Sequence, residues 1–138
     1  MTAGYSGTPL PRKLGLRPGE AVLLLGDPLA FDTSALAAPV DRTPPAGTTD
    51  YPVVLLFCPD VAALAEHFET AKAAHTTAGA IWVCWPKKSS GITTDLTETT
   101  VREFGLAGGR VDVKVAAIDA TWSGLKFVIR LADRGQTR

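Results

Sequence analysis

Three apolar runs along the chain have the composition of strands that are buried on both faces of a sheet. They are 21–25 (AVLLL), 53–58 (VVLLFC) and 81–85 (IWVCW), and glycine or proline directly follows each run. A short continuous apolar run bounded in this way is typical of a buried strand, and a parallel sheet of such strands needs helices on both faces. The pattern therefore predicts an α/β fold.

Two helical segments are expected between these strands. Pro28 is well placed as the first residue of a short helix that extends to about Leu36, because proline fits the first helical turn. Asp60 is placed to cap a longer helix, in which apolar residues recur at spacings of three and four, and Gly79 is expected to end it. The longer helix thus presents one apolar face to the sheet.

A polar loop and a third helix are predicted after the third strand, which ends at Pro86. Asp95 precedes Glu98 by three residues, the spacing at which an N-cap side chain and an N3 carboxylate each satisfy an open backbone N–H group. A helix over about 96–104 follows, and Gly105 is expected to stop it. The loop therefore lies between the carboxyl end of a strand and the start of a helix.

The last part of the chain has the pattern of an antiparallel hairpin. Alternating residues over 113–118, the turn DATWSG at 119–124 and an apolar stretch over 125–131 predict two strands and their connection. Three strands separated by helices and followed by a hairpin indicate a mostly parallel sheet of about five strands.

The length of 138 residues and the 46% hydrophobic content are those of one globular domain with its own core. We predict a single α/β domain over residues 1–138, with a polar amino-terminal arm at 1–9. The region 38–52 is rich in proline, threonine and alanine and predicts an irregular loop, and 132–138 predicts a polar tail.

The charge balance excludes several classes of partner. The chain carries 14 basic and 14 acidic residues, so its formal net charge is zero, and neither nucleic acid nor an anionic membrane surface is an expected partner. No apolar stretch approaches the roughly 18 residues of a membrane helix, and the start, MTAGYSGTPL, lacks the pattern of a signal peptide. We therefore expect a cytoplasmic protein.

The cysteines and histidines do not form a metal-binding motif. Cys58 and Cys84 lie at or near the carboxyl ends of predicted strands, where we expect them as buried, reduced thiols. Together with His67 and His75 they lack the paired spacing of a metal site, and the two histidines are expected on the surface of the longer helix. No metal or other cofactor is predicted.

The polar loop and the hairpin turn supply the candidate ligand-binding residues. Ligands of open α/β sheets lie outside the carboxyl ends of the strands, where two lysines and a helix start would favour an anion. The candidate residues are Lys87, Lys88, Ser89, Ser90, Gly91, Thr94, Asp119, Trp122 and Ser123.

The same residues also have a purely structural interpretation. The lysines would be solvated, the serines and glycine would form a turn, and the Asp119 and Ser123 side chains would hydrogen-bond the turn backbone. Trp122 would either line a pocket or anchor a partner, or fold back onto a helix. Both interpretations are open at the level of sequence.

Nucleotide and hydrolase motifs are missing. The first strand is followed by GDPLAF, which lacks the glycines that let a backbone approach a pyrophosphate, and Asp27 places a negative charge there. Neither GxxxxGK[ST] nor Gly-x-Ser-x-Gly occurs in the chain. No nucleotide site and no hydrolase triad is predicted.

Several motifs resemble a small bacterial family that is catalogued only as a domain of unknown function. They are GYSGTPL with KLGL at the amino end, PKKSSGITTDLTE in the middle and IDATWSGLKFVIR near the end. This resemblance covers most of the chain. It implies no activity and no catalytic residue.

The order of elements is similar to that in the carboxyl-terminal half of Rossmann-like methyltransferases. This second resemblance implies a three-layer Rossmann-like sheet in the order 1-2-3-5-4, with the last strand antiparallel between the third and the fourth. The chain lacks the glycine-rich loop of those enzymes and an acidic residue at the end of a second strand for the ribose. Methyl transfer is therefore not predicted.

Two functions remain as hypotheses. The first is a non-catalytic binding or regulatory module that holds a small anion or a protein partner at the polar loop and the hairpin turn. The alternative is an enzyme acting on an anionic small molecule, with Lys87 or Lys88 stabilising charge and Asp119 moving a proton. The absence of histidine and metal motifs favours the first. An exposed hairpin edge would allow a homodimer, with Lys114, Lys126 and Arg130 as charges that oppose it.

Overall fold

The computed structural model describes residues 8–26, 28, 31–42 and 51–134. Parts of the predicted arm, irregular loop and tail, together with Asp27, lie outside these residues. The elements in chain order are α1 (Leu10–Leu14), β1 (Val22–Gly26), η1 (Thr33–Leu36), β2 (Val40–Asp41), β3 (Tyr51–Phe57), α2 (Val61–Ala74), β4 (His75–Pro86), η2 (Lys88–Ser90), α3 (Glu98–Ala107), β5 (Val111–Ala117), β6 (Trp122–Val128) and η3 (Leu131–Asp133), where η denotes a 3₁₀ helix. Within the described residues no helix is long and apolar enough to cross a membrane.

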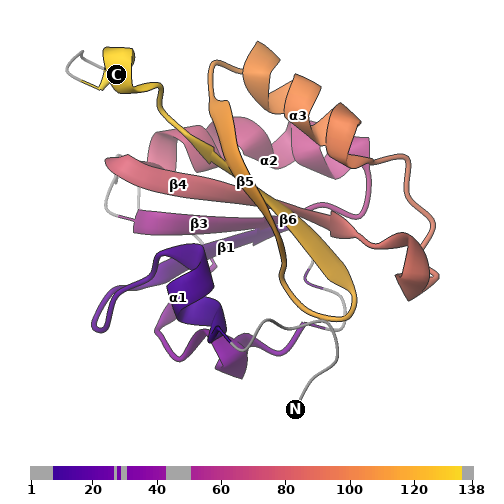
Figure 1. Cartoon of the computed structure of the whole chain (residues 1–138), viewed down its shortest axis with the longest axis horizontal. Helices are drawn as coiled ribbons and strands as arrows, with labels where there is room; N and C mark the ends of the chain where they lie inside the picture. The colour runs from indigo at the N-terminus through magenta and orange to yellow at the C-terminus, as the bar shows by residue number, and fades with distance from the viewer. Residues whose placement is uncertain (1–7, 27, 29–30, 43–50, 135–138) are drawn as a thin grey trace.

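The described residues form one mostly parallel sheet of six strands in the order β2-β1-β3-β4-β6-β5 (Figure 1). Strands β2, β1, β3 and β4 are parallel, and β6 is antiparallel to both β4 and β5. The α/β class is confirmed, but the predicted count of about five strands is wrong, so the order of the whole sheet differs from the predicted one. The five predicted strands keep their predicted relative order, with β6 antiparallel between β4 and β5. The additional strand is β2, which lies in the proline-rich region and pairs through Val40 with Val22 of β1. Backbone pairing at an edge needs no apolar run, so the sequence pattern did not reveal it.

Helices α2 and α3 cover one face of the sheet, and α1 with η1 lies on the other (Figure 1). Side chains of each central strand alternate between the two faces, because successive residues of a strand point in opposite directions. In β1, Leu23 and Leu25 face α2, whereas Val22 and Leu24 face α1. The sheet is therefore the middle of three layers, as the buried apolar runs require.

The α2 helix confirms the predicted start and corrects the predicted end. The Asp60 carboxylate accepts a hydrogen bond from the Ala63 N–H at 2.9 Å, as an N-cap should. The helix ends at Ala74, however, and β4 begins at His75, so Gly79 lies inside a strand. A side chain at Gly79 would put its Cβ 2.7 Å from the Pro52 carbonyl oxygen. Glycine is needed there for the close approach of β4 to β3, and it does not stop the helix.

The α3 helix begins and ends later than predicted. Its N-cap is Thr97, whose hydroxyl accepts a hydrogen bond from the Thr100 N–H at 3.1 Å, so Asp95 is not the cap. Gly105 is buried within the helix, and Gly108 is the C-cap residue. The sequence-based assignment was wrong because two acceptors, Asp95 and Thr97, stand near the start, and only packing selects between them.

His75 is buried, which contradicts the predicted surface position. It is the first strand residue after α2, and its Nε2 atom lies 3.0 Å from Nε of Arg110 while its Nδ1 atom lies 2.7 Å from the Thr76 carbonyl oxygen. Since a guanidinium donates hydrogen bonds, Nε2 is the acceptor and Nδ1 carries the proton. The imidazole is therefore a neutral structural group at the end of α2.

Two further segments differ from the sequence prediction. Among the described residues of the segment from Pro28 to Leu36, which was predicted to be a helix, only η1 is helical, with Asp32 as its N-cap. Trp122 lies in β6 and is not part of the turn, and β6 ends at Val128. In each case backbone hydrogen bonding moved the boundary by a few residues, which is the usual weakness of boundaries inferred from sequence.

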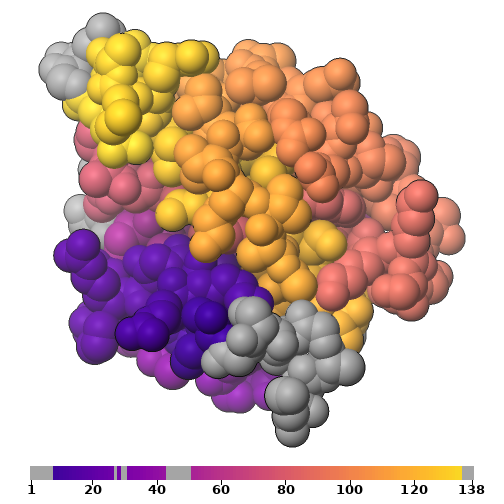
Figure 2. All heavy atoms as spheres, viewed as in Figure 1, coloured from indigo at the N-terminus to yellow at the C-terminus, as the bar shows by residue number. Residues whose placement is uncertain are grey.

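Strand β5 is one edge of the sheet, as the hairpin pattern predicted. Val113 and Val115 are 53% and 46% exposed, and the pairing with β6 is irregular between Asp112 and Lys114. Figure 2 shows the indigo α1 residues beside the orange β5 residues, and Lys13 Nζ donates to the Ala117 carbonyl oxygen at 3.1 Å. The irregular ladder, the exposed Lys114 and the hydrogen bond from Lys13 to the last residue of the strand are features that oppose strand addition at an edge.

Candidate functional site

The polar loop and the hairpin turn meet at the carboxyl ends of the strands. The Lys87 N–H donates to the Thr121 carbonyl oxygen at 2.8 Å, which joins the two segments that the sequence singled out. The Lys88 and Ser89 side chains are exposed in η2, and Gly91 closes η2 with a positive φ of 79°. The predicted site residues thus lie in one region of the molecule.

The hydroxyl groups of this loop are used by the loop itself. Ser90 Oγ donates to the Lys87 carbonyl oxygen at 2.6 Å and accepts from the Ile92 N–H at 3.1 Å. Thr94 Oγ1 accepts from the Leu96 N–H at 3.1 Å. These bonds give the serine and the threonine the turn-forming role of the structural interpretation.

The residues of the hairpin turn are engaged in the same way. One Asp119 carboxylate oxygen accepts from the N–H groups of both Thr121 and Trp122 at 2.8 Å. Trp122 is fully buried and packs edge-on against Phe57, with ring centroids 5.0 Å apart. Ser123 is half-buried and pairs with Trp85 across the ladder between β6 and β4. The indole of Trp122 is therefore a core group and not a pocket wall.

The start of α2, at the same end of the sheet, is occupied by carboxylates. Asp95 Oδ1 accepts from the Val61 N–H at 2.8 Å, and Asp60 accepts from the Ala63 N–H. An incoming anion would have to displace these acceptors and would meet their negative charge. The helix start is thus unsuited to an anion. The ammonium groups of Lys87 and Lys88 make no hydrogen bond or ion pair within the described part of the chain, so these two lysines are the groups of this region that could still attract one.

Replacing Asp95 with alanine is expected to lower the free energy of unfolding by about 0.5–2 kcal/mol, because the Val61 N–H loses its acceptor at the helix start. Asp95→Asn keeps a side-chain oxygen and should retain most of this stability. Urea denaturation followed by circular dichroism measures both variants. An unchanged midpoint in Asp95→Ala would contradict the contact between Asp95 and α2.

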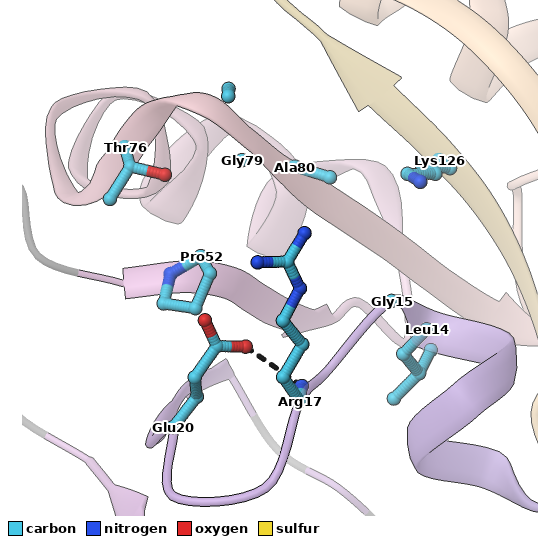
Figure 3. Close-up of a pocket in the computed structure, with 10 residues that line it drawn as sticks. Leu14, Gly15, Arg17, Glu20, Pro52, Thr76, Gly79, Ala80 and Lys126 are labelled. Carbon is cyan, nitrogen blue, oxygen red and sulfur yellow. Dashed lines mark hydrogen bonds between the residues drawn. The ribbon is translucent and has the colours of Figure 1, made fainter.

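A second candidate site lies at the opposite, amino ends of the parallel strands. It is a pocket of about 230 Å³, and the loop before β1, the first residues of β3 and β4 and the end of β6 surround it (Figure 3). The lining residues are Leu14, Gly15, Arg17, Glu20, Pro52, Thr76, Ala78, Gly79, Ala80 and Lys126. Figure 3 shows the Arg17 side chain extending from its loop toward β4. The pocket joins segments from both halves of the chain.

Two cations line this pocket. Lys126 is half-buried; burial lowers the pKa of its ammonium group, and the nearby charges of Lys114 and Arg134 lower this pKa further. Lys114 is the residue directly opposite Lys126 in the ladder between β5 and β6, and like charges in that position repel. Neither Arg17 nor Lys126 forms an ion pair within the described residues. The site therefore holds positive charge that a bound anion would neutralise.

The acidic side chain in the lining is that of Glu20. Its Oε1 atom accepts a hydrogen bond from the Arg17 backbone N–H at 2.8 Å, which holds the turn before β1 (Figure 3). The hydrogen bond with Glu20 uses only the backbone of Arg17, so the guanidinium group of Arg17 remains available to a ligand in the pocket. Two cations against one carboxylate give the lining a net positive charge.

Sequence reasoning missed this second site. Arg17 and Glu20 flank the turn at Pro18, but Lys126 is more than a hundred residues away, and Thr76 was expected inside a helix. No local motif unites residues so far apart. The only local signal was Lys126, a lysine within an otherwise apolar strand. The sequence pattern led us to interpret it as one of the charges that protect an edge strand.

The cysteines are structural. Cys58 and Cys84 are free and buried, and they belong to the cores on opposite faces of the sheet. Burial raises the pKa of both thiols, with smaller contributions from Asp60 at Cys58 and from Cys58 and Asp119 at Cys84. A thiol that resists ionisation is a poor nucleophile. In the described part of the chain no cluster of His, Cys, Asp and Glu could hold a metal ion.

Comparisons with known proteins leave the family open. No protein-family model matches the chain and no curated protein matches its sequence, so the resemblance to a bacterial family of unknown function is not supported. Among solved structures, that of the LepI complex with SAM is similar with a TM-score of 0.49 and 15% identity. The match covers 88% of this chain and 39% of the LepI chain. With a TM-score below 0.5, no property of LepI is carried over.

Proposed function

We propose that this protein is a non-catalytic binding or regulatory module that holds a small anion in the pocket between Arg17 and Lys126. The scaffold resembles the carboxyl-terminal half of Rossmann-like methyltransferases in its order of elements, but the proposed ligand lies at the opposite end of the strands. The observation that carries the proposal is the half-buried Lys126 ammonium, placed beside other cations and without an ion-pair partner among the described residues.

The unfavourable free energy of a charged, half-buried Lys126 supports a binding role. A lowered pKa means that the charged form of Lys126 is less favoured in the folded than in the unfolded chain. Its charge therefore destabilises the fold at neutral pH, and this effect is lost as the pH rises from the folded-state pKa through the higher unfolded-state pKa. A side chain that weakens the fold is typical of a functional site, where stability is given up for binding. The remaining lining, mostly small residues, is suited to holding an anion.

Replacing Lys126 with methionine tests the proposal. Isothermal titration calorimetry with inorganic phosphate should show a Kd about tenfold to a hundredfold higher in Lys126→Met, since a charge-assisted hydrogen bond contributes about 1.5–3 kcal/mol and 1.4 kcal/mol is a factor of ten. Without phosphate, Lys126→Met should unfold at the same or a higher urea concentration than the wild type. This combination separates a binding residue from a structural one.

Lys88→Met is the matched control, because Lys88 is an exposed lysine of η2 at the other end of the sheet. It should bind phosphate as the wild type does. A loss of binding in Lys88→Met together with normal binding in Lys126→Met would place the anion at the polar loop. Absence of phosphate binding in the wild type would contradict the proposed function itself.

A further inference from the structure

The pocket between Arg17 and Lys126, at the amino ends of the parallel strands, is small and favours a small ligand. Its volume is about 230 Å³. Pockets for drug-sized ligands begin at about 300 Å³. A phosphate group with a short carbon chain fits this space, and a nucleotide exceeds it.

The charges of the lining favour a doubly charged anion. Arg17 and Lys126 enter the pocket from the loop before β1 and from β6 (Figure 3). Arg17 offers a planar fork of N–H donors and Lys126 offers a compact ammonium, and both bind phosphate oxygens well. Lys114 adds positive charge beside Lys126, because the two residues are paired across the ladder. A phosphate dianion neutralises such a site more completely than a carboxylate does.

The Glu20 carboxylate favours a ligand that offers a hydrogen-bond donor, which a bare phosphate dianion lacks. One oxygen of the Glu20 carboxylate accepts a hydrogen bond from the Arg17 N–H, and both Glu20 and Thr76 belong to the lining (Figure 3). A carboxylate accepts hydrogen bonds and repels anions. Its place beside two cations therefore suits a ligand that carries a hydroxyl group next to its phosphate.

From these observations we infer that the ligand is the phosphate monoester of a small polyol, with its phosphate between Arg17 and Lys126 and a hydroxyl group donating to Glu20. This inference rests on the proposed function, because it assigns a chemical class to the anion of the same pocket. The hydroxyl contact supplies selectivity, whereas the two cations supply most of the affinity.

Calorimetric titration of the full chain with four probes tests the inference. Glycerol 3-phosphate should bind at least tenfold tighter than inorganic phosphate, because it adds the hydroxyl contact with Glu20. Glycerate, a monoanion of similar size, should bind at least tenfold weaker than glycerol 3-phosphate. Adenosine monophosphate should bind weaker than glycerol 3-phosphate, because its base and ribose exceed the pocket.

Glu20→Gln is the informative variant. Glutamine keeps a side-chain oxygen for the Arg17 N–H and so preserves the turn, but it removes the negative charge. Inorganic phosphate should bind Glu20→Gln as tightly as the wild type or tighter, while the preference for glycerol 3-phosphate should fall about tenfold. A preference that is unchanged in Glu20→Gln would overturn the assigned contact.

The outcomes distinguish this inference from the proposed function. If phosphate binds in a manner that depends on Lys126 but glycerol 3-phosphate binds no tighter, the ligand class is wrong and the anion site stands. Equal affinity for glycerate would overturn the preference for a dianion, and equal or tighter binding of adenosine monophosphate would overturn the size argument. If none of the four probes binds, the proposed function fails with the inference.

Discussion

Replacing Trp122 with alanine is expected to lower the free energy of unfolding by about 3–5 kcal/mol, the usual cost of removing a large buried aromatic side chain. Trp122 is fully buried in the core between the sheet and α1, and its ring meets Phe57 edge-on. Truncation would leave a cavity between β6 and β3 that neighbouring side chains cannot fill. Urea denaturation followed by tryptophan fluorescence and circular dichroism measures the loss.

A second substitution controls for general effects of truncation. Leu131 is 78% exposed in η3, so Leu131→Ala should change the free energy of unfolding by less than about 0.5 kcal/mol. The sequence offered Trp122 as a ligand or partner anchor, and such a surface role predicts little loss of stability. A loss below 1 kcal/mol in Trp122→Ala would support that role and contradict the buried position.

Replacing Gly105 with alanine is expected to lower the free energy of unfolding by about 3 kcal/mol, at the upper end of the usual range for overpacking. Alanine at a helix interior normally gains about 1 kcal/mol over glycine. Here, however, a Cβ at Gly105 would lie 2.1 Å from Cε1 and 2.3 Å from Cζ of Phe127. Phe127 is fully buried, so its ring cannot move aside without disturbing the core. The clash therefore outweighs the gain in helix propensity.

Phe127→Leu provides the test of this cause. The smaller side chain should make room for the methyl group, so the double variant should be more stable than the sum of the two single effects predicts, by about 0.5–3 kcal/mol. Thermal and urea unfolding of the four proteins give the coupling energy. Additive effects would indicate that Gly105 acts locally, as a helix stop would. Leu106→Ala, at an exposed neighbouring position, should leave stability nearly unchanged.

The α2 and α3 helices show where sequence reasoning succeeded and failed. Asp60 stands alone as an acceptor before an apolar-periodic segment, so the start of α2 followed from local chemistry. At α3, Asp95 and Thr97 were both able to cap, and Asp95 was taken by the start of α2, 34 residues earlier in the chain. The local sequence cannot predict which of the two acceptors caps α3, because the choice depends on a distant N–H group.

The two glycines that were predicted to end helices show the same limit of prediction from local sequence. Gly79 and Gly105 both lie inside regular elements, one against the Pro52 carbonyl and the other against the Phe127 ring. A glycine that allows close approach and a glycine that ends a helix look alike in sequence. Only the position of the neighbouring element distinguishes them.

Of the two candidate sites, one could be located from the sequence and the other could not. The sequence located the polar loop and the hairpin turn, and the structure joins them through the bond between Lys87 and Thr121. It could not locate the pocket of Arg17, Glu20 and Lys126, because these residues come from the two ends of the chain. The register of β6 between β4 and β5 is what brings Lys126 to the amino ends of the strands.

By itself, the sequence determined the α/β class, the three central strands and the start of α2, because continuous apolar runs and an N-cap residue act over a few positions. The tertiary structure alone decided the edge strand β2, the burial of Trp122 and His75 and the pocket around Lys126. These features depend on contacts between segments far apart in the chain. Such contacts are selected by the packing of the whole sheet and leave no pattern in the local sequence.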